Sequence, residues 1–304
     1  TILMIRPVGF RMNEQTAVNN FFQEDLDIKN AEINIKAQNE FDAFVEVLKS
    51  KGVNVIVIND TNEPDTPDSI FPNNWISFHE NGTVGLYPMF AENRRDERRE
   101  DVLDVLEKNG FIINDIVDYT SAEEDEFFLE GTGSILLDRI NKKAYCALSD
   151  RADEELFIEF CEDFDYFPVV FTANQSVDGK RMPIYHTNVM MCLGEKFSVI
   201  CSDTIDDKKE RKIVLDHLHH DGKEIIRISE QQMHQFAGNM LQVLGKDNKR
   251  YLVMSSSAYN SLTEEQIKSV SKYSEIIHSS LETIEACGGG SARCMMAEIF
   301  LPKK

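Results

Sequence analysis

Near its end the 304-residue chain reads Cys287-Gly288-Gly289-Gly290-Ser291-Ala292-Arg293-Cys294-Met295-Met296. Three successive glycines allow the backbone to approach a ligand closely or to adopt positive φ. They arrive just before Cys294, which we expect to open the last strand, Cys294–Phe300. A nucleophilic thiol needs this kind of access and a nearby base. Taken alone, the segment makes Cys294 either a nucleophile or a small buried hydrophobe, the usual fate of a lone cysteine.

The segment resembles the nucleophile motif of the guanidino-group-modifying superfamily, also called the amidinotransferase or pentein superfamily. Three further motifs of that superfamily follow in the expected order upstream: Phe71-Pro72-Asn73-Asn74-Trp75, Leu129-Glu130-Gly131-Thr132-Gly133 and Tyr185-His186-Thr187-Asn188. Each motif alone is weak, but four in order are strong. The resemblance covers residues 68–296 and takes in Met4–Pro7 as a first strand. It implies one domain over residues 1–304, an α/β-propeller of five ββαβ modules around a central active-site pocket.

The resemblance also implies catalytic roles. Cys294 corresponds to the nucleophile, His186 to the general acid/base, and Glu130 to the carboxylate that grips the nitrogens of the substrate head group. Arg94 and Arg151 resemble arginines that bind a substrate carboxylate. The guanidinium of an arginine side chain suits this role because it can bind both oxygens of a carboxylate at once. A solvated surface position is the alternative for either arginine. No metal and no cofactor are implied.

Substrate choice is read from residues that depart from the arginine deiminase pattern. Asp68 is expected to hold an α-ammonium group, and Asn73 joins the substrate-binding set. Asn74 and Asn188 stand where arginine deiminases present aspartates to a cationic guanidinium. Guanidinium offers only donors, whereas a neutral ureido group also has an acceptor oxygen, which asparagine can match. We further expect residues 186 and 188 to share one strand face.

These substitutions favour citrulline as substrate, with ornithine as product, and resemble the citrulline-utilisation branch of the superfamily. Arginine deiminase, arginine dihydrolase and amidinotransferase activities stay open, since an amine could intercept the covalent intermediate before water does. A non-catalytic binding protein on the same propeller is the alternative from another class. Gly238-Asn239 is either a helix C-cap or a family position near the active site.

Pattern alone predicts a single α+β domain with about ten short strands and five helices. Expected strands are Val53–Ile58, Thr83–Tyr87, Ile135–Leu137, Ala144–Leu148, Phe167–Phe171, Val189–Leu193, Phe197–Cys201, Glu224–Ile228, Tyr251–Met254 and Cys294–Phe300. Expected helices contain 41–48, 102–106, 156–160 and 213–218, with a fifth opening at Thr263 through a capping box. A doubly wound sheet would alternate strands and helices one for one, so this chain has too many strands for that fold.

Composition restricts the partners. The chain has 53 acidic and 32 basic residues, a net charge of −21, which disfavours nucleic acid and mildly attracts a small cationic or zwitterionic amino-acid substrate. No apolar run approaches the ~18 residues of a membrane span. Six cysteines without CxxC pairs suit reduced thiols, so a cytoplasmic location is expected. The oligomeric state stays open, a homodimer included.

Overall fold

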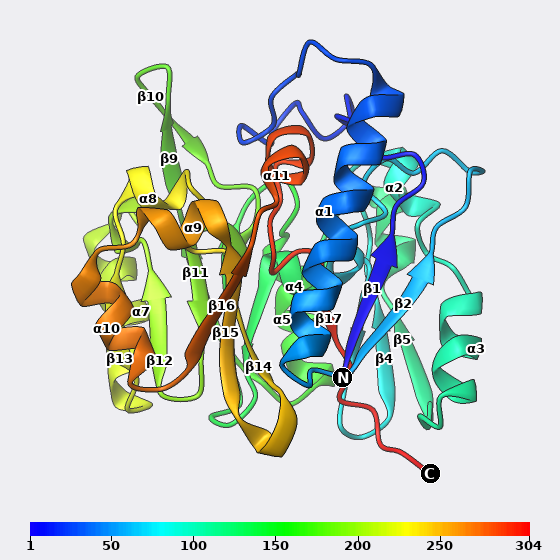
Figure 1. The fold of residues 1–304 in the computed structure, drawn as a ribbon. Helices are drawn as coiled ribbons and strands as arrows, with labels where there is room; N and C mark the ends of the chain where they lie inside the picture. Colours follow the sequence, from blue (N-terminus) through cyan, green and yellow to red (C-terminus); the bar gives the residue numbers. More distant parts are fainter.

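The computed structural model describes residues 1–304 and has an α/β fold built from small sheets, with no closed barrel (Figure 1). Its strands form five three-stranded sheets and one two-stranded hairpin. In each three-stranded sheet, the central strand pairs antiparallel with one neighbour and parallel with the other. The same arrangement thus recurs along the chain, and it explains why strands outnumber helices.

The sheets, with strands in pairing order, are β17 (Ala297–Glu298), β1 (Ile2–Arg6) and β2 (Val55–Asn59); β3 (Ile76–Phe78), β4 (Thr83–Leu86) and β5 (Asp115–Asp118); β6 (Ile135–Asp138), β7 (Lys143–Leu148) and β8 (Phe167–Thr172); β11 (Met191–Leu193), β12 (Phe197–Ile200) and β13 (Glu224–Arg227); and β14 (Leu241–Leu244), β15 (Arg250–Ser255) and β16 (Glu275–Ser279). The hairpin consists of β9 (Asn174–Val177) and β10 (Lys180–Pro183). Because β17 pairs with β1, the last strand of the chain completes the sheet that the first strand begins.

A parallel strand pair needs a long crossover connection, and helices supply it here. These helices are α1 (Asn30–Ser50), α3 (Asp101–Lys108), α5 (Glu154–Asp163), α7 (Lys208–His220), and α9 (Ser256–Ser261) followed by α10 (Glu264–Ser271). The shorter helices are α2 (Glu92–Arg95), α4 (Gly131–Ser134), α6 (Thr187–Met190), α8 (Glu230–Met233) and α11 (Glu282–Gly288), with 3-10 turns η1 (Pro72–Asn74), η2 (Thr120–Asp125), η3 (Ser202–Thr204) and η4 (Lys246–Asn248). In Figure 1, α3 and α10 lie at opposite sides of the molecule.

All five predicted helices are present. α1 buries Phe41, Phe44 and Leu48 as its apolar spacing predicts, although it begins at Asn30, well before that stripe. Replacing such a fully buried phenylalanine by alanine typically costs about 3–5 kcal/mol, so this stripe is a main source of stability. Thr263 caps α10 through the predicted capping box, accepting from the Gln266 backbone amide.

Two strand predictions at the site are wrong. Cys294 does not open a strand but lies in a turn, closed by a hydrogen bond from its amide to the Ser291 carbonyl (3.0 Å), and β17 starts only at Ala297. Nor do His186 and Asn188 share a strand face, because residues 187–190 form α6 and β11 begins at Met191. Short apolar runs do not distinguish one helical turn from a strand, which is why the pattern misled.

Several strands escaped prediction altogether: β3, β5, β14, β16 and both strands of the hairpin. They are three to five residues long. Strands this short carry too few residues for a reliable period-2 pattern.

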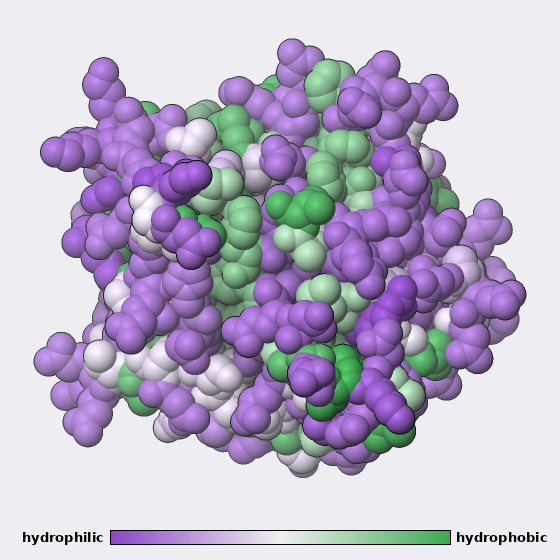
Figure 2. Space-filling view, turned by 90° about the horizontal axis from the view of Figure 1, so that it is seen from above, coloured by the Kyte–Doolittle hydropathy of each residue, from purple (hydrophilic) through white to green (hydrophobic).

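The surface agrees with the acidic composition. Seen from above the view of Figure 1, the molecule is largely hydrophilic, with apolar side chains gathered near the middle of this face (Figure 2). No helix has both the length and the apolar character needed to cross a membrane.

Candidate active site

Five equivalent segments, each leading into the first strand of one sheet, bring polar side chains to the centre of the molecule. Asn74 lies in η1 before β3, and Glu130 is the N-cap of α4 before β6. His186 is the N-cap of α6 before β11. Asn239 directly precedes β14, and Cys294 lies in the turn before β17. The site is therefore assembled by the repeat of the fold and not by neighbouring residues in sequence.

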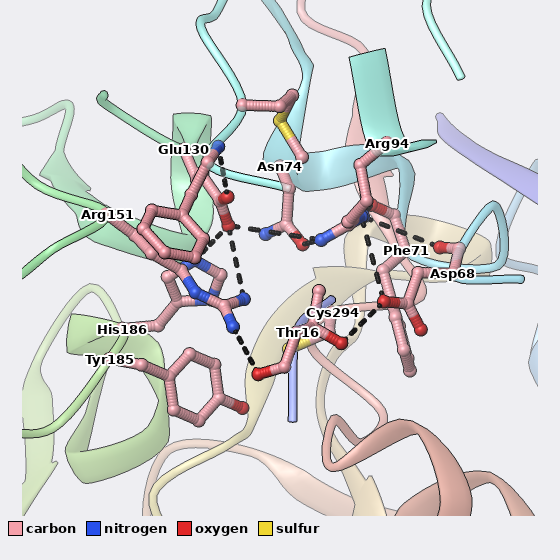
Figure 3. Close-up of polar contacts among 12 residues, drawn as sticks. Thr16, Asp68, Phe71, Asn74, Arg94, Glu130, Arg151, Tyr185, His186 and Cys294 are labelled. Carbon is pink, nitrogen blue, oxygen red and sulfur yellow. Dashed lines mark hydrogen bonds and ion pairs between the residues drawn. The ribbon is translucent and has the colours of Figure 1, made fainter. Parts of the chain in front are cut away.

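These segments surround a small cavity. It is lined by Thr16, Asn20, Asp68, Phe71, Asn74, Arg94, Arg151, Tyr185, His186, Gly288, Gly290 and Cys294. Figure 3 shows the side chains converging around Cys294, with His186 and Arg151 on one side and Asp68 and Phe71 on the other. Thr16 and Asn20 come from the long loop between β1 and α1, which covers this end of the molecule.

The Cys294 sulfur lies between two asparagine amides. Asn239 Nδ2 is 3.2 Å from Sγ, and Asn188 Nδ2 is 3.5 Å from it. A hydrogen bond from the Arg293 backbone amide to Asn239 Oδ1 (3.0 Å) fixes the position of the Asn239 side chain. No arginine, lysine or histidine hydrogen-bonds the sulfur, so its negative charge as a thiolate is met at these two positions by neutral N–H donors.

The turn that contains Cys294 is packed tightly against Asn73 and Phe71. In one orientation of its amide, Asn73 donates to the Cys294 carbonyl (2.5 Å) and accepts from the Gly133 amide (3.3 Å). A side chain at Gly290 would start 2.9 Å from the Phe71 ring and 3.4 Å from Cys294 Cβ. The glycine run is therefore needed for close approach of the backbone to Phe71, beside the nucleophile.

His186 and Glu130 form a buried hydrogen-bonded pair, with Nε2 2.7 Å from Glu130 Oε2. Oε1 of the same carboxyl accepts from the Phe90 amide at 3.1 Å. Burial works to raise the pKa of Glu130, but the Arg151 charge and the His186 hydrogen bond outweigh it and lower the pKa to about 2. Burial lowers the pKa of His186 to about 4 against the opposing effect of Glu130.

At neutral pH the pair is thus a neutral imidazole and a carboxylate. Because a carboxylate only accepts, the imidazole proton belongs on Nε2, and Nδ1 carries the free lone pair. Nδ1 has no hydrogen-bonding partner in the protein, and a side chain at Gly133 would come within 2.8 Å of it. His186 lines the cavity and carries an unprotonated nitrogen without a partner in the protein, as a general base requires.

Arg94 is fully buried and already neutralised. It donates to both oxygens of Glu97 (2.8 and 2.9 Å) and, through Nη1, to Asn74 Oδ1 (2.8 Å). Its Nε also lies 4.0 Å from Asp68 Oδ2. The surface position considered for this arginine is thereby excluded, since only 2% of it is exposed.

Asp68 and Arg151 are held by the β1–α1 loop. Asp68 Oδ2 accepts from Asn13 Nδ2 (2.8 Å) and Thr16 Oγ1 (3.1 Å), whereas Oδ1 is buried without a partner. Burial raises the pKa of Asp68, although Arg94 opposes the shift. Arg151 donates to Asn19 Oδ1 (3.0 Å, from Nε) and the Thr16 carbonyl (2.9 Å), and its guanidinium lies 5.0 Å from the centre of the Tyr185 ring.

Of the nine site residues predicted from sequence, six line the cavity: Asp68, Asn74, Arg94, Arg151, His186 and Cys294. The other three are buried just behind the wall. Glu130 supports His186, Asn73 supports the Cys294 turn, and Asn188 contacts the sulfur. Glu130 and Asn188 therefore contact the cavity-lining residues His186 and Cys294 and do not line the cavity themselves.

Several contributors were not predicted. Thr16, Asn19 and Asn20 lie in a loop with no recognisable motif, and Glu97 sits in an acidic and basic run that reads as surface. Asn239 is not a helix C-cap, since α8 ends at Met233. The alternative that the sequence had left open, a position near the active site, agrees with the contact of its side chain with the Cys294 sulfur. No group of three or more His, Cys, Asp or Glu side chains is arranged to hold a metal ion.

The repeated small sheets and this cavity define a protein of the amidinotransferase, or pentein, superfamily, as the four motifs suggested. More narrowly, the chain belongs to the family described as N,N dimethylarginine dimethylhydrolase, eukaryotic, whose model matches residues 6–301. The family-model match places the chain among the hydrolases of this superfamily, which act on C–N bonds, and it speaks against a non-catalytic propeller protein. No curated protein sequence matches the chain.

Solved structures with the same fold include three informative ones. Apo ArgZ, an arginine dihydrolase from the ornithine-ammonia cycle in cyanobacteria, gives a TM-score of 0.74 at 17% identity, over 100% of this chain and 41% of that chain. The N-terminal domain of ArgZ bound to substrate gives 0.70 at 17%, over 99% of both chains. A dimethylarginine dimethylaminohydrolase adduct with S-methyl-L-thiocitrulline gives 0.65 at 12%, over 97% and 98%.

The chain thus spans about two fifths of the full-length ArgZ chain and matches its N-terminal domain throughout. At these identities the likeness establishes the fold.

Proposed function

We propose that this protein hydrolyses the ureido group of citrulline and releases ornithine, ammonia and carbon dioxide. The observation that carries the proposal is the hydrogen bond from Arg94 Nη1 to Asn74 Oδ1 (2.8 Å). It occupies the only acceptor of the Asn74 side chain and leaves Nδ2, which has no acceptor in the protein, as the group offered to the cavity that Asn74 lines.

An N–H donor at this position discriminates between the two candidate head groups. A guanidinium has five N–H donors and no acceptor, so Asn74 Nδ2 would face another donor. The ureido oxygen of citrulline accepts, and it also gains negative charge when a nucleophile attacks the adjacent carbon. A donor placed there in a closed cavity therefore stabilises the transition state more than the ground state.

The proposed chemistry has two halves. The Cys294 thiolate attacks the ureido carbon, a C–S bond forms, and one C–N bond breaks as the departing nitrogen takes a proton. His186, with Glu130 holding its Nε2–H, first takes that proton on Nδ1 from the Cys294 thiol and then delivers it to the departing nitrogen. The imidazole then removes a proton from a water molecule, which attacks the thiocarbamate and releases the thiolate. The carbamate formed in this step decomposes to carbon dioxide and the remaining amine, which breaks the second C–N bond. Asn188 and Asn239 donate to the sulfur before and after the covalent stage.

The amino-acid end of the substrate needs one anionic and one cationic partner. Asp68, whose Oδ1 lacks any partner, is proposed to take the α-ammonium. Of the two arginines, Arg94 is engaged by both oxygens of Glu97, whereas Arg151 is held by a neutral amide oxygen and a carbonyl. Arg151 also lies 3.6 Å from Glu130 Oε2, but it makes no hydrogen bond to a carboxylate. Its neutral hydrogen-bond partners are replaced at lower cost than the carboxylate of Glu97, so Arg151 is proposed to bind the α-carboxylate.

Arginine is the second candidate substrate. Three buried carboxyl groups, Asp68, Glu97 and Glu130, lie beside two buried arginines, Arg94 and Arg151. Burial raises the pKa of Asp68, and that of Glu97 to about 8, and an additional positive charge would favour their ionised forms. ArgZ is described as an arginine dihydrolase, and a structure of AgrE holds L-arginine. Deiminase, dihydrolase and transferase outcomes differ only in what leaves and what intercepts the covalent intermediate.

The test is incubation of the purified chain with citrulline and with arginine in separate reactions, scoring ornithine, citrulline and ammonia. Ornithine from citrulline supports the proposal. Ornithine or citrulline formed only from arginine would replace it with the second candidate. The Cys294→Ala variant must be inactive toward either substrate.

We also propose that residues 1–304 form one domain in which the five sheets are the blades of a propeller around the cavity. The recurrence of the same strand pairing and the convergence of five equivalent segments support this arrangement. A crystal structure in which the sheets are not related by successive rotations about the cavity would overturn it.

A further inference from the structure

A second and larger cavity, of about 480 Å³, lies at the opposite end of the molecule from the loop that covers the active site. Its rim is formed by the β6–β7, β11–β12 and β14–β15 turns, and the β14–β15 turn lies at the bottom of Figure 1. Leu136, Leu193 and Met240 contribute to an apolar wall. Arg293, the neighbour of Cys294 in sequence, also lines this cavity and not the catalytic one.

Arg293 is a buried cation with too few partners. Only 3% of the residue is exposed, yet its guanidinium makes one protein hydrogen bond, from Nη1 to the Met296 carbonyl (2.7 Å). Its one ion pair is long, with Nη2 3.5 Å from the nearest carboxylate oxygen, on Glu298. A guanidinium has five N–H donors, and a buried charge is normally paired and fully hydrogen-bonded. Arg293 therefore has donors free for a ligand in the cavity.

Arg139 is a second guanidinium in the same cavity. It has no carboxylate oxygen within 4.0 Å, makes one long hydrogen bond to the Phe78 carbonyl (3.4 Å) and stacks at 3.9 Å on the Phe300 ring. Burial lowers the pKa of Arg293, Glu298 opposes that shift, and the charge of Arg139 adds to it. The two guanidiniums thus act on each other as like charges inside a chain whose net charge is −21.

The other charges of this cavity are accounted for. Lys223 lies 2.8 Å from Asp138, and Arg250 lies 2.7 Å from Glu195. Glu80 is exposed at the rim and forms no ion pair with either free arginine. What is left over is two arginines and a single carboxylate, Glu298, beside an apolar wall. This arrangement leaves one positive charge for an oxyanion carried on an aliphatic body.

We propose that this cavity is a second binding site, which takes a small aliphatic carboxylate with its anionic end at Arg139 and Arg293 and its body against Leu136, Leu193 and Met240. This site is separate from the catalytic cavity, where we propose that the substrate binds. A ligand bound at Arg293 should affect Cys294 through Asn239. The Arg293 backbone amide donates to Asn239 Oδ1 (3.0 Å), and Asn239 Nδ2 lies 3.2 Å from the Cys294 sulfur.

The experiment is a calorimetric titration of the full chain with 4-methylpentanoate, and with the uncharged 4-methylpentanamide as a probe of matched shape. The acid is expected to bind about tenfold or more tightly than the amide, because a hydrogen bond to a charged group contributes about 1.5–3 kcal/mol. Equal binding of acid and amide would reduce the cavity to an apolar pocket and overturn the proposal. So would stronger binding of inorganic phosphate than of the acid.

Two matched variants locate the site. Arg139→Gln should weaken binding of the acid about tenfold, whereas Arg151→Gln, the same change in the catalytic cavity, should leave it intact. The reverse pattern would place the probe in the substrate site and sink the proposal. Leu193→Trp, which fills the apolar wall, is a second independent variant and should also abolish binding. Arg139→Gln lies outside the catalytic machinery, so turnover of substrate should be unchanged.

Discussion

Asn239 Nδ2 lies 3.2 Å from the sulfur of Cys294, although the two residues are 55 positions apart in the chain. Both occupy the segment that leads into the first strand of a sheet, Asn239 before β14 and Cys294 before β17. A neutral donor at this distance stabilises a thiolate without the fixed cation that many reactive cysteines use. The contact therefore connects the repeat of the fold to the reactivity of the nucleophile.

Asn239→Ala should slow the reaction of Cys294 with iodoacetamide at neutral pH and shift its pH profile upward. A hydrogen bond to a charged group is worth about 1.5–3 kcal/mol, so about a tenfold or larger loss of thiolate reactivity is expected. Asn188→Ala, which removes the longer 3.5 Å contact, should have a smaller effect in the same direction. An unchanged profile for Asn239→Ala would show that the amide does not act on the thiolate.

Cys294 should be the one cysteine labelled selectively by a small haloacetamidine, as read by mass spectrometry. Burial raises the pKa of the other five thiols, to about 12 for Cys161, Cys192 and Cys201, to about 11 for Cys287, and still further for Cys146. Of the six cysteines, only Cys294 lines the catalytic cavity. Uniform labelling, or none, would contradict the assignment of the nucleophile.

Glu130→Gln should lower kcat by about 100-fold or more, because general acid–base catalysis contributes about 10²–10⁴-fold and depends on the orientation of His186. The amide can still accept from Nε2–H, so the fold should persist, but the negative charge that favours the protonated imidazole is lost. Circular dichroism serves as the control for folding. Wild-type turnover by this variant would remove Glu130 from the mechanism.

Folding stability should fall as the pH drops from about 6.5 to about 4, in part because of His186. Burial lowers its folded-state pKa to about 4 from the ordinary 6.5, so the unfolded chain binds the proton first. Its contribution is fully present above pH 6.5, and up to about 3 kcal/mol is lost through this window. Urea unfolding of the wild type and of His186→Asn gives the difference, and parallel pH profiles for the two would contradict the shift.

Asn74→Asp should move substrate preference from citrulline toward arginine. A carboxylate at residue 74 can still accept from Arg94 Nη1, but it replaces the Nδ2 donor by an acceptor that suits guanidinium. The ratio of kcat/KM for the two substrates should change by about tenfold or more, as expected when a charged hydrogen bond is exchanged. Asn248→Asp, on an exposed turn far from the cavity, controls for added charge. An unmoved ratio would refute the charge-matching argument.

Much of the site could be predicted because its motifs are local. Glycines before Cys294, the capping box at Thr263 and the apolar stripe of α1 each depend on a few consecutive residues, and the structure contains all three. Predictions of backbone conformation failed where an element is a single turn. Cys294 and Asn188 were both assigned to strands, yet one lies in a turn and the other in the four-residue helix α6.

The sequence by itself determined the superfamily, the residue types of the site and their order, because these are recorded in short motifs. Only the tertiary structure decided which side chains face the cavity, which stand behind it and which occupy each other's hydrogen-bonding atoms. Arg94 uses the acceptor of Asn74, and Asn239 reaches the sulfur of Cys294, through contacts between segments far apart in the chain. The physical reason is that such distances are set by how the five sheets pack, and no local pattern encodes a side-chain distance across that packing.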